Sequence, residues 1–296
     1  MQLKTSSKNR QASYAYFPGC SLAASGHENN RSIYKFCEKM AINLEELEDW
    51  NCCGSSSTHS IDSKAAALLP QRNLTLAPKG VPLLVACPSC YLRMRSAHEG
   101  IKNDAEAMER YETQWGKNFD PDLEIIHFFD LFKKLAKDVF ESSVVTPLNG
   151  IRFAPYYGCM LAKPPLLRND TRHSGVLENT LKSLGADPVS WPHFAKCCGT
   201  YLSVAKPEVV TKLVDQIMES AIKAGAECLV TACAMCHLNL EIRCSRKEQI
   251  PTFHFSELLC IAFGVDDHEK WFKRHIVDPV PLLKRKNLIG SSQDKQ

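Results

Sequence analysis

Ten of the 14 cysteines in this 296-residue chain follow one order that occurs once in each half: a single cysteine, two adjacent cysteines followed by glycine, and two cysteines separated by two residues. The first set is Cys20, Cys52, Cys53, Cys87 and Cys90, and the second set is Cys159, Cys197, Cys198, Cys233 and Cys236. Intervals of 31 and 33 residues in the first set are matched by 37 and 34 in the second. The two sets are therefore duplicates of one domain, and they predict two metal centres.

Three kinds of thiol chemistry compete for each set. A disulfide between adjacent cysteines is disfavoured, because their Cα atoms lie about 3.8 Å apart and ordinary bridges need about 4.4–6.8 Å. Zinc accepts about four ligands, so it would leave one thiol of each set unused. Five recurring thiols favour a larger iron–sulfur cluster in which neighbouring thiolates reach different irons.

Glycines flank the cysteines at corresponding positions in both halves. Gly19 and Gly158 precede the single cysteines, and Gly54 and Gly199 follow the adjacent pairs. We expect these glycines to adopt positive φ angles and to let the backbone approach the cluster.

Length and composition indicate an ordinary globular protein of two domains, and we expect these to span residues 1–148 and 149–296. A formal net charge of +3 is close to neutral for this length and does not indicate nucleic-acid binding. The polar start of the chain does not resemble a secretory signal, and no apolar stretch approaches the ~20 residues needed to span a bilayer. We expect a cytoplasmic protein without a membrane span, in which reduced thiols bind metal.

Each half alternates strands with helices, which predicts an α/β fold of two tandem Cys-Cys-Gly domains, each a small, mostly parallel sheet flanked by helices. The cysteines then lie at the carboxyl ends of strands, where open α/β sheets bind ligands. Expected strands are Tyr14 to Phe17, Ile151 to Tyr157, Pro82 to Cys87 and Cys228 to Cys233, and expected helices are Glu28 to Met40, Asp62 to Ala77, Gly175 to Leu184 and Pro207 to Ala224. The sequence from His127 is similar to that from His254, whereas the stretch from Gly100 to Pro121 has no counterpart and predicts an inserted helix and loop.

With this double five-cysteine motif, nearly the whole chain resembles the Cys-Cys-Gly proteins, most closely the B subunit of heterodisulfide reductase. The resemblance implies two noncubane 4Fe-4S clusters, each bound by one of the two five-cysteine sets. The intervals before Cys87 and Cys233 look one or two residues shorter than is usual in the family, which puts only the fine geometry in doubt. Zinc in one of the two sites is the alternative.

The resemblance also implies a function. The chain would be the catalytic component of a heterodisulfide reductase-like complex, cleaving or forming a small disulfide between the clusters, or oxidising a sulfur-bearing thiol on a lipoate-binding protein in the form found in sulfur-oxidising bacteria. Its partners would be a ferredoxin protein like the C subunit of that enzyme and a flavoprotein like its A subunit. The alternatives are an iron–sulfur electron-relay component of a succinate, glycolate or lactate dehydrogenase-type complex, and a zinc-stabilised scaffold.

Other residues near the motifs have two interpretations each. His59, His193 and His237 are candidate proton donors to a leaving thiolate, or ordinary surface or core histidines. Tyr156, Tyr157 and Tyr201 would line the cleft or pack in the core. Cys37, Cys228 and Cys260 are expected to be small buried hydrophobic residues. Cys244 lies beside Arg243 and Arg246 and is interpreted as an ordinary thiol, with a thiol of lowered pKa as the alternative.

Overall fold

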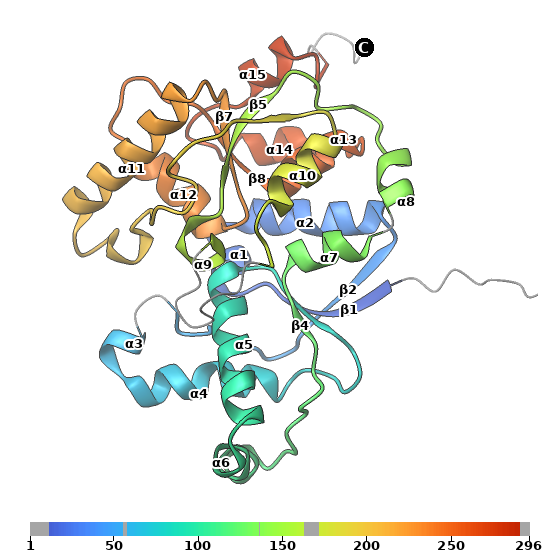
Figure 1. Cartoon of the computed structure of the whole chain (residues 1–296), viewed down its shortest axis with the longest axis vertical. Helices are drawn as coiled ribbons and strands as arrows, with labels where there is room; N and C mark the ends of the chain where they lie inside the picture. The colour runs from blue at the N-terminus through green and yellow to red at the C-terminus, as the bar shows by residue number, and fades with distance from the viewer. Residues whose placement is uncertain (1–11, 56–57, 136, 163–171, 291–296) are drawn as a thin grey trace, which may run out of the picture.

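The structure is a computed structural model that describes residues 12–55, 58–135, 137–162 and 172–290. It contains two four-stranded parallel sheets, one in each half, in the orders β2-β1-β3-β4 and β6-β5-β7-β8 (Figure 1). The strands are β1 (Ala12–Phe17), β2 (Ile42–Glu46), β3 (Leu83–Val85), β4 (Ile125–Ile126), β5 (Arg152–Tyr156), β6 (Asp187–Pro188), β7 (Cys228–Thr231) and β8 (Thr252–His254). The predicted α/β architecture is confirmed.

Helices connect the parallel strands. The first half contains α1 (Cys20–Ala23), α2 (His27–Lys39), α3 (Thr58–Ile61), α4 (Ser63–Leu74), α5 (Pro88–Lys102), α6 (Ala105–Trp115), α7 (Phe128–Lys134) and α8 (Lys137–Ser142). The second half contains α9 (Gly158–Ala162), α10 (Val176–Ser183), the 3-10 turn η1 (Thr200–Leu202), α11 (Pro207–Lys223), α12 (Ala234–Arg243), α13 (Phe255–Ala262), α14 (His268–Phe272) and α15 (Val280–Arg285). The eight predicted strands and helices all occur, with ends that differ by up to three residues.

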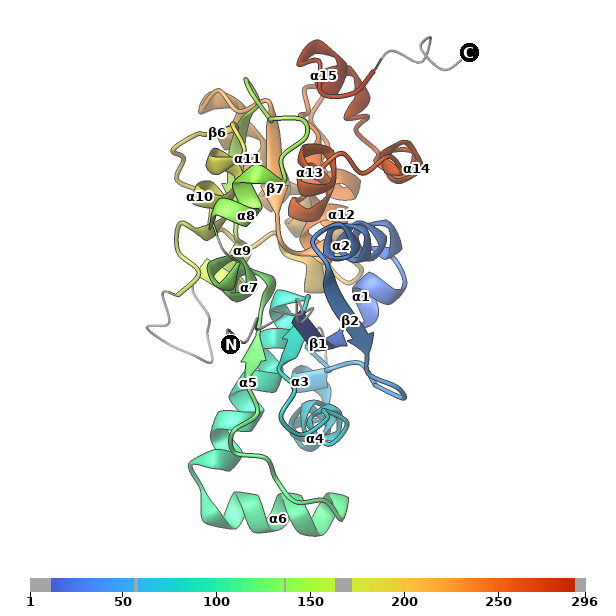
Figure 2. The ribbon, with the colours of Figure 1, turned by 90° about the vertical axis from the view of Figure 1, so that its right-hand side faces the viewer.

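The inserted segment forms a helix with no equivalent in the second half. Asp104 caps the first turn of α6 by accepting hydrogen bonds from the backbone N–H groups of Glu106 and Ala107, and Gly116 ends the helix in the left-handed conformation. Figure 2 shows α6 at the end of the molecule farthest from α15. The predicted insertion is therefore an extension away from the cysteines.

The related sequences at His127 and His254 form the same local structure. Each histidine is the N-cap of a helix whose third residue is an acid, Asp130 in α7 and Glu257 in α13. The acid accepts a hydrogen bond from the backbone N–H of the histidine, at 3.0 Å in α7 and 2.8 Å in α13. The similarity thus reflects a repeated helix start beside the last strand of each sheet.

The two halves pack through equivalent helices. α2 of the first half lies against α13 of the second, and α7 lies against α10 (Figure 1). Because α2 corresponds to α10 and α7 to α13 in chain order, the two contacts are related by an approximate two-fold axis. One buried hydrophobic core runs through this junction, from Phe36 and Phe128 in the first half to Phe255 and Phe263 in the second.

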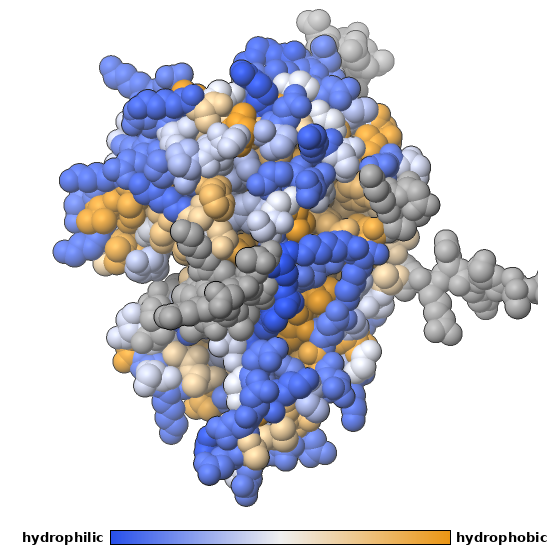
Figure 3. All heavy atoms as spheres, viewed as in Figure 1, coloured by the Kyte–Doolittle hydropathy of each residue, from blue (hydrophilic) through white to orange (hydrophobic). Residues whose placement is uncertain are grey.

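The described helices include none that is long and apolar enough to cross a membrane. The face shown in Figure 3 is mostly hydrophilic, with separate hydrophobic patches between charged side chains.

Candidate cluster site

Every cysteine of both sets lies in the loop or the helix start that follows the carboxyl end of a strand. Cys20 begins α1 directly after β1, and Cys159 lies in the first turn of α9 directly after β5. Cys87 and Cys233 follow β3 and β7 and are the N-caps of α5 and α12, so Cys90 and Cys236 lie in the first turns of these helices. The adjacent pairs lie in the loops after β2 and β6. Parallel pairing brings the carboxyl ends of these strands to one edge of each sheet.

The two edges face each other across one cleft of about 530 Å³, and all ten cysteines line it. The approximate two-fold packing produces this arrangement, because α1 lies against α12 and α5 lies against α9. Cys20 is exposed and Cys159 is half-buried, whereas Cys53, Cys90 and Cys198 are buried. The two sets of thiols thus open onto a single cavity.

Within each set the thiols contact one another. Sγ of Cys20 lies 3.3 Å from Sγ of Cys52, and Sγ of Cys53 lies 3.0 Å from Sγ of Cys90. In the second set, Sγ of Cys198 lies 3.5 Å from Sγ of Cys236. No disulfide is present among the described cysteines.

Hydrogen bonds between the thiols lower the pKa of one partner and raise the pKa of the other. Hydrogen bonds from Cys20 and Cys53 and from the backbone N–H of Gly54 outweigh burial and lower the pKa of Cys52 to about 2. The equivalent Cys197 receives hydrogen bonds from Cys159 and from Gly199, which lower its pKa to about 6 against the effect of burial. The pKa values of Cys20 and Cys159 are raised, first by the hydrogen bond that each makes to its partner thiol. A metal cluster would bind the sulfurs of a set as thiolates and supply the positive charge that compensates them, so the donor set fits a metal cluster.

The spacing of the sulfurs also bears on which metal group fits. Tetrahedral zinc, with Zn–S bonds of about 2.3 Å, brings its sulfurs to about 3.8 Å from one another. Within the described part of the chain, no three cysteines have sulfurs that all lie within 4.8 Å of one another. The thiols contact one another in pairs and, among the described residues, do not form the compact group that a single zinc ion needs, so a polynuclear cluster fits them better.

The flanking glycines adopt the expected positive φ angles, between 65° and 79°. A Cβ on Gly19 would lie 2.9 Å from Sγ of Cys90, so this glycine makes room beside the thiols. Gly54 and Gly199 have a different role from the one expected, because a Cβ there would meet side chains of α3 and α4 or of α11 rather than sulfur.

None of the described residues that line the cleft is a histidine. His193 lies outside the lining, and His237 lies behind Cys236, where its Nδ1 is 2.9 Å from Nδ2 of Asn29. The side chain of His59 lies outside the described residues. Tyr157 and Tyr201 line the cleft, whereas Tyr156 is fully buried and donates a hydrogen bond to the carbonyl of Lys196 at 2.5 Å.

The other cysteines divide as follows. Cys37, Cys228 and Cys260 are buried, as expected. The alternative of a lowered pKa does not hold for Cys244: burial raises the pKa of this thiol and Asp215 adds to the effect, whereas Arg246 only partly opposes it.

Sequence reasoning missed Arg93, which is the one charged side chain among the described residues that line the cleft. It lies three residues after Cys90 on α5, so both side chains share one helix face. The three-residue spacing between Cys90 and Arg93 was the sequence signal that could have identified this arginine.

Comparison with known proteins agrees with this geometry. Residues 14–95 and 153–241 each match the CCG cysteine-rich domain, and together they make up more than half of the chain. The chain belongs to the CCG cysteine-rich domain family. Both matched regions include a complete five-cysteine set.

Relatives of this CCG protein fall into different functional groups. It is 28% identical to the 8-methylmenaquinol:fumarate reductase membrane anchor subunit of Wolinella succinogenes, over 92% of this chain and 99% of that protein. It is 26% identical to the B subunit of the ferredoxin/F420H2-dependent CoB-CoM heterodisulfide reductase of Methanosarcina acetivorans, over 92% of this chain and 96% of that protein. It is 24% identical to lactate utilization protein A of an Exiguobacterium species, over 70% of this chain and 80% of that protein.

A solved structure shares the fold. The crystal structure of a hypothetical protein from Helicobacter pylori superposes with a TM-score of 0.69 at 15% identity, over 90% of this chain. The chain spans about half the length of that structure, at 52%.

Proposed function

We propose that the cleft is the site of two-electron redox chemistry at sulfur, and that the chain is the catalytic component of a heterodisulfide reductase-like complex. The observation that carries the proposal is that all ten cysteines line one cleft. Reduction of a disulfide takes two electrons and two protons and yields two thiols. Two metal centres that face one cavity match that stoichiometry. Similarity to the B subunit of heterodisulfide reductase over nearly the whole chain supports the same function.

The ten cysteines would hold two noncubane 4Fe-4S clusters, one for each set. When bound, these groups supply one-electron redox chemistry at iron. The pairwise contacts of the thiols, without a compact group of three sulfurs among the described residues, support this assignment over zinc in either set.

The side chains of the cleft would bind and shield the substrate. Arg93 provides a cation for an anionic group of a small disulfide or thiol. Leu92, Met160 and Met235 provide apolar surface that displaces water from the sulfur atoms. Because none of the described lining residues is a histidine, we propose that solvent supplies the protons through the open side of the cleft.

Electrons would enter or leave through partner proteins. The proposed partners are a ferredoxin protein like the C subunit of heterodisulfide reductase and a flavoprotein like its A subunit, in the cytoplasm. In the oxidative direction, the substrate would be a sulfur-bearing thiol on a lipoate-binding protein.

A second function is favoured by one specific observation, the similarity to the Wolinella succinogenes fumarate reductase protein at 28% identity over almost its full length. In that case the clusters would relay electrons in a succinate or fumarate type complex. A relay needs neither a common cleft nor a cation at its centre, so the geometry supports it less.

The decisive experiment is metal and acid-labile sulfide analysis of protein purified without oxygen, followed by EPR after addition of thiols. About eight irons and eight sulfides per chain, with a paramagnetic signal that depends on the thiol, are expected for two substrate-binding clusters. The same iron content without any response to thiols would favour the relay. Zinc without sulfide would contradict both functions.

A further inference from the structure

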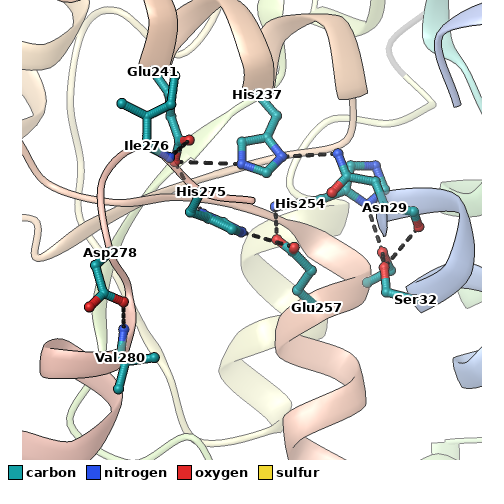
Figure 4. A network of polar contacts seen from close by, with 11 residues as sticks. Asn29, Ser32, His237, Glu241, His254, Glu257, His275, Ile276, Asp278 and Val280 are labelled. Atoms are coloured by element: carbon teal, nitrogen blue, oxygen red, sulfur yellow. Dashed lines mark hydrogen bonds and ion pairs between the residues drawn. The ribbon is translucent and has the colours of Figure 1, made fainter. Parts of the chain in front are cut away.

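Four ionisable side chains form a buried group behind the second cysteine set (Figure 4). His275 lies between two carboxylates: its Nδ1 is 3.1 Å from Oε1 of Glu241 and its Nε2 is 3.0 Å from Oε1 of Glu257. Nε2 of His237 lies 3.6 Å from the same Glu241 oxygen. The side chains of His275, Glu241 and Glu257 are at most 3% exposed. Buried carboxylates of this kind require a compensating cation.

The group joins parts of the chain that are far apart in sequence. His237 and Glu241 come from α12, Glu257 comes from α13, and His275 comes from the segment after α14. Backbone N–H groups fix the second oxygen of each carboxylate, that of Ile276 to Glu241 and that of His254 to Glu257, each at 2.8 Å. Both first oxygens are thereby aimed at His275.

Three ligand atoms can face a metal if the metal displaces the proton between Nε2 of His275 and Oε1 of Glu257, which lie 3.0 Å apart. Glu241 would keep the proton on Nδ1 of His275, which leaves the lone pair of Nε2 for the metal. Asn29 contacts Nδ1 of His237, and rotation of its amide places the carbonyl oxygen there to accept a proton, which leaves Nε2 of His237 free. Such an outer carboxylate or amide is the usual partner of a metal-bound histidine. One nitrogen of each imidazole and one oxygen of Glu257 lie within 4.8 Å of one another.

The charge of the group also calls for a cation. The carboxylates of Glu241 and Glu257 are at most 3% exposed, and each accepts one backbone N–H, which offsets only part of its charge. A proton on His275 compensates one of the two negative charges, whereas a divalent metal compensates both.

We propose that His237, Glu257 and His275 bind a zinc ion, and that Glu241 positions His275. Two imidazoles and one carboxylate are an established zinc donor set. The ion would fasten α12, which carries Cys236, to α13 and to the segment around His275. This zinc site is separate from both cysteine sets and does not depend on the function of the cleft.

The first half has Asp130 where the second half has Glu257, but it lacks the equivalents of His237 and Glu241. Tyr91 follows Cys90 as His237 follows Cys236, and Arg95 stands where the second half has Glu241. Among the described residues, His237, Glu257 and His275 are the one group of three whose ligand atoms lie this close. The site therefore distinguishes the two otherwise duplicated halves.

The test is element analysis of the full-length protein, purified without oxygen, as wild type, H275Q and the control H27Q, which replaces an exposed histidine on α2. We expect about one zinc per chain in the wild type and in H27Q and almost none in H275Q, with iron and sulfide unchanged. Zinc X-ray absorption of the wild type should show only nitrogen and oxygen neighbours at about 2.0–2.2 Å.

Three results would overturn the proposal. Wild-type protein without zinc would mean that the group is an ion network alone. Sulfur neighbours at about 2.3 Å would place the zinc in a cysteine set. Mononuclear iron in place of zinc would refute the choice of metal. If H275Q does not fold, E257Q serves as the second variant, and the absorption spectrum of the wild type decides by itself.

Discussion

Cys52 and Cys197 occupy equivalent places in their sets, and hydrogen bonds from neighbouring thiols and from a glycine N–H lower the pKa of each. Serine at either position keeps the size of the side chain but removes a thiolate ligand. We expect C197S to lose the iron of the second set, which is about half of the total, and to lose all disulfide reduction. Iron determination and a turnover assay check this expectation.

The matched control is C244S, because Cys244 is also half-buried in the second half but lies outside the cleft lining. It should retain the iron of the wild type. Full iron content in C197S would mean that this cysteine is not a ligand.

Arg93 gives a second prediction at the residue scale. A charge-assisted hydrogen bond contributes about 1.5–3 kcal/mol, so R93M should raise KM for an anionic disulfide roughly 10- to 100-fold and change kcat little. Arg95 contacts the hydroxyl of Tyr91 at 3.0 Å and does not line the cleft, so R95M is the control. Equal KM values for R93M and the wild type would exclude Arg93 from substrate binding.

At this scale the sequence predicted which cysteines come together and missed their surroundings. The ten cysteines could be identified because their order and intervals recur. Arg93 and His275 lack such a pattern: Arg93 is one of two arginines in α5, and His275 reaches the α12 carboxylate only through tertiary packing. The arginines near Cys244 in sequence suggested the alternative of a lowered pKa, but burial raises the pKa of this thiol in the fold.

The turn from β1 into α1 depends on Gly19, whose φ is +79°. Alanine there would be strained by about 1–3 kcal/mol, because φ 79° with ψ 161° is a conformation reached almost only by glycine, and it would also press its Cβ against Sγ of Cys90. We expect G19A to lower the iron content of the first set. Gly80 has a φ of +74° and open space around it, so G80A is the control. This variant has backbone strain but no contact with a sulfur atom, and the protein should keep the iron of the first set. Equal iron loss in both variants would show that strain alone is responsible.

The start of α7 gives a prediction about acid stability. Burial lowers the pKa of His127 to about 3, and the neighbouring His173 and His254 also lower it. The carboxylate of Asp130 raises this pKa, but by less. Between pH 6.5 and about 3 the unfolded chain therefore binds a proton that the folded chain does not, so stability falls as the pH falls through this window.

Asparagine is a good N-cap that does not titrate, so H127N should remove this contribution. Between pH 6.5 and 5 the wild type should lose about 2 kcal/mol more unfolding free energy than H127N. Denaturant unfolding at the two pH values measures the difference. The same loss in both proteins would mean that His127 is charged in the fold.

At the scale of elements, the sequence predicted the long helices and the strands that lead into cysteines. It gave no signal for β4 and β8 as strands, because they are two or three residues long and are defined by pairing with a neighbour. The short helices α1 and α9 were missed for a similar reason, since a single turn has no periodicity.

The whole molecule is held together by the junction between its halves. Ser32 of α2 and Ser256 of α13 approach within 2.5 Å through their hydroxyls, and the ring centroids of Phe36 and Phe263 lie 5.6 Å apart. Phe255 contacts Phe128 and Phe129 across the same junction. The sequence predicted two domains, but this shared core ties each sheet to helices of the other half.

We therefore propose that the two CCG domains unfold as one unit. Phe255 is 1% exposed, and F255A should cost about 3–5 kcal/mol. If the halves are one cooperative unit, this change in the second half will reduce amide protection in β1 and β3 of the first half as strongly as in β5 and β7. Hydrogen exchange measured by mass spectrometry resolves the four strands. Wild-type protection of β1 and β3 in F255A would mean that the first half keeps its own stability, and that the cleft is assembled from two independently stable domains.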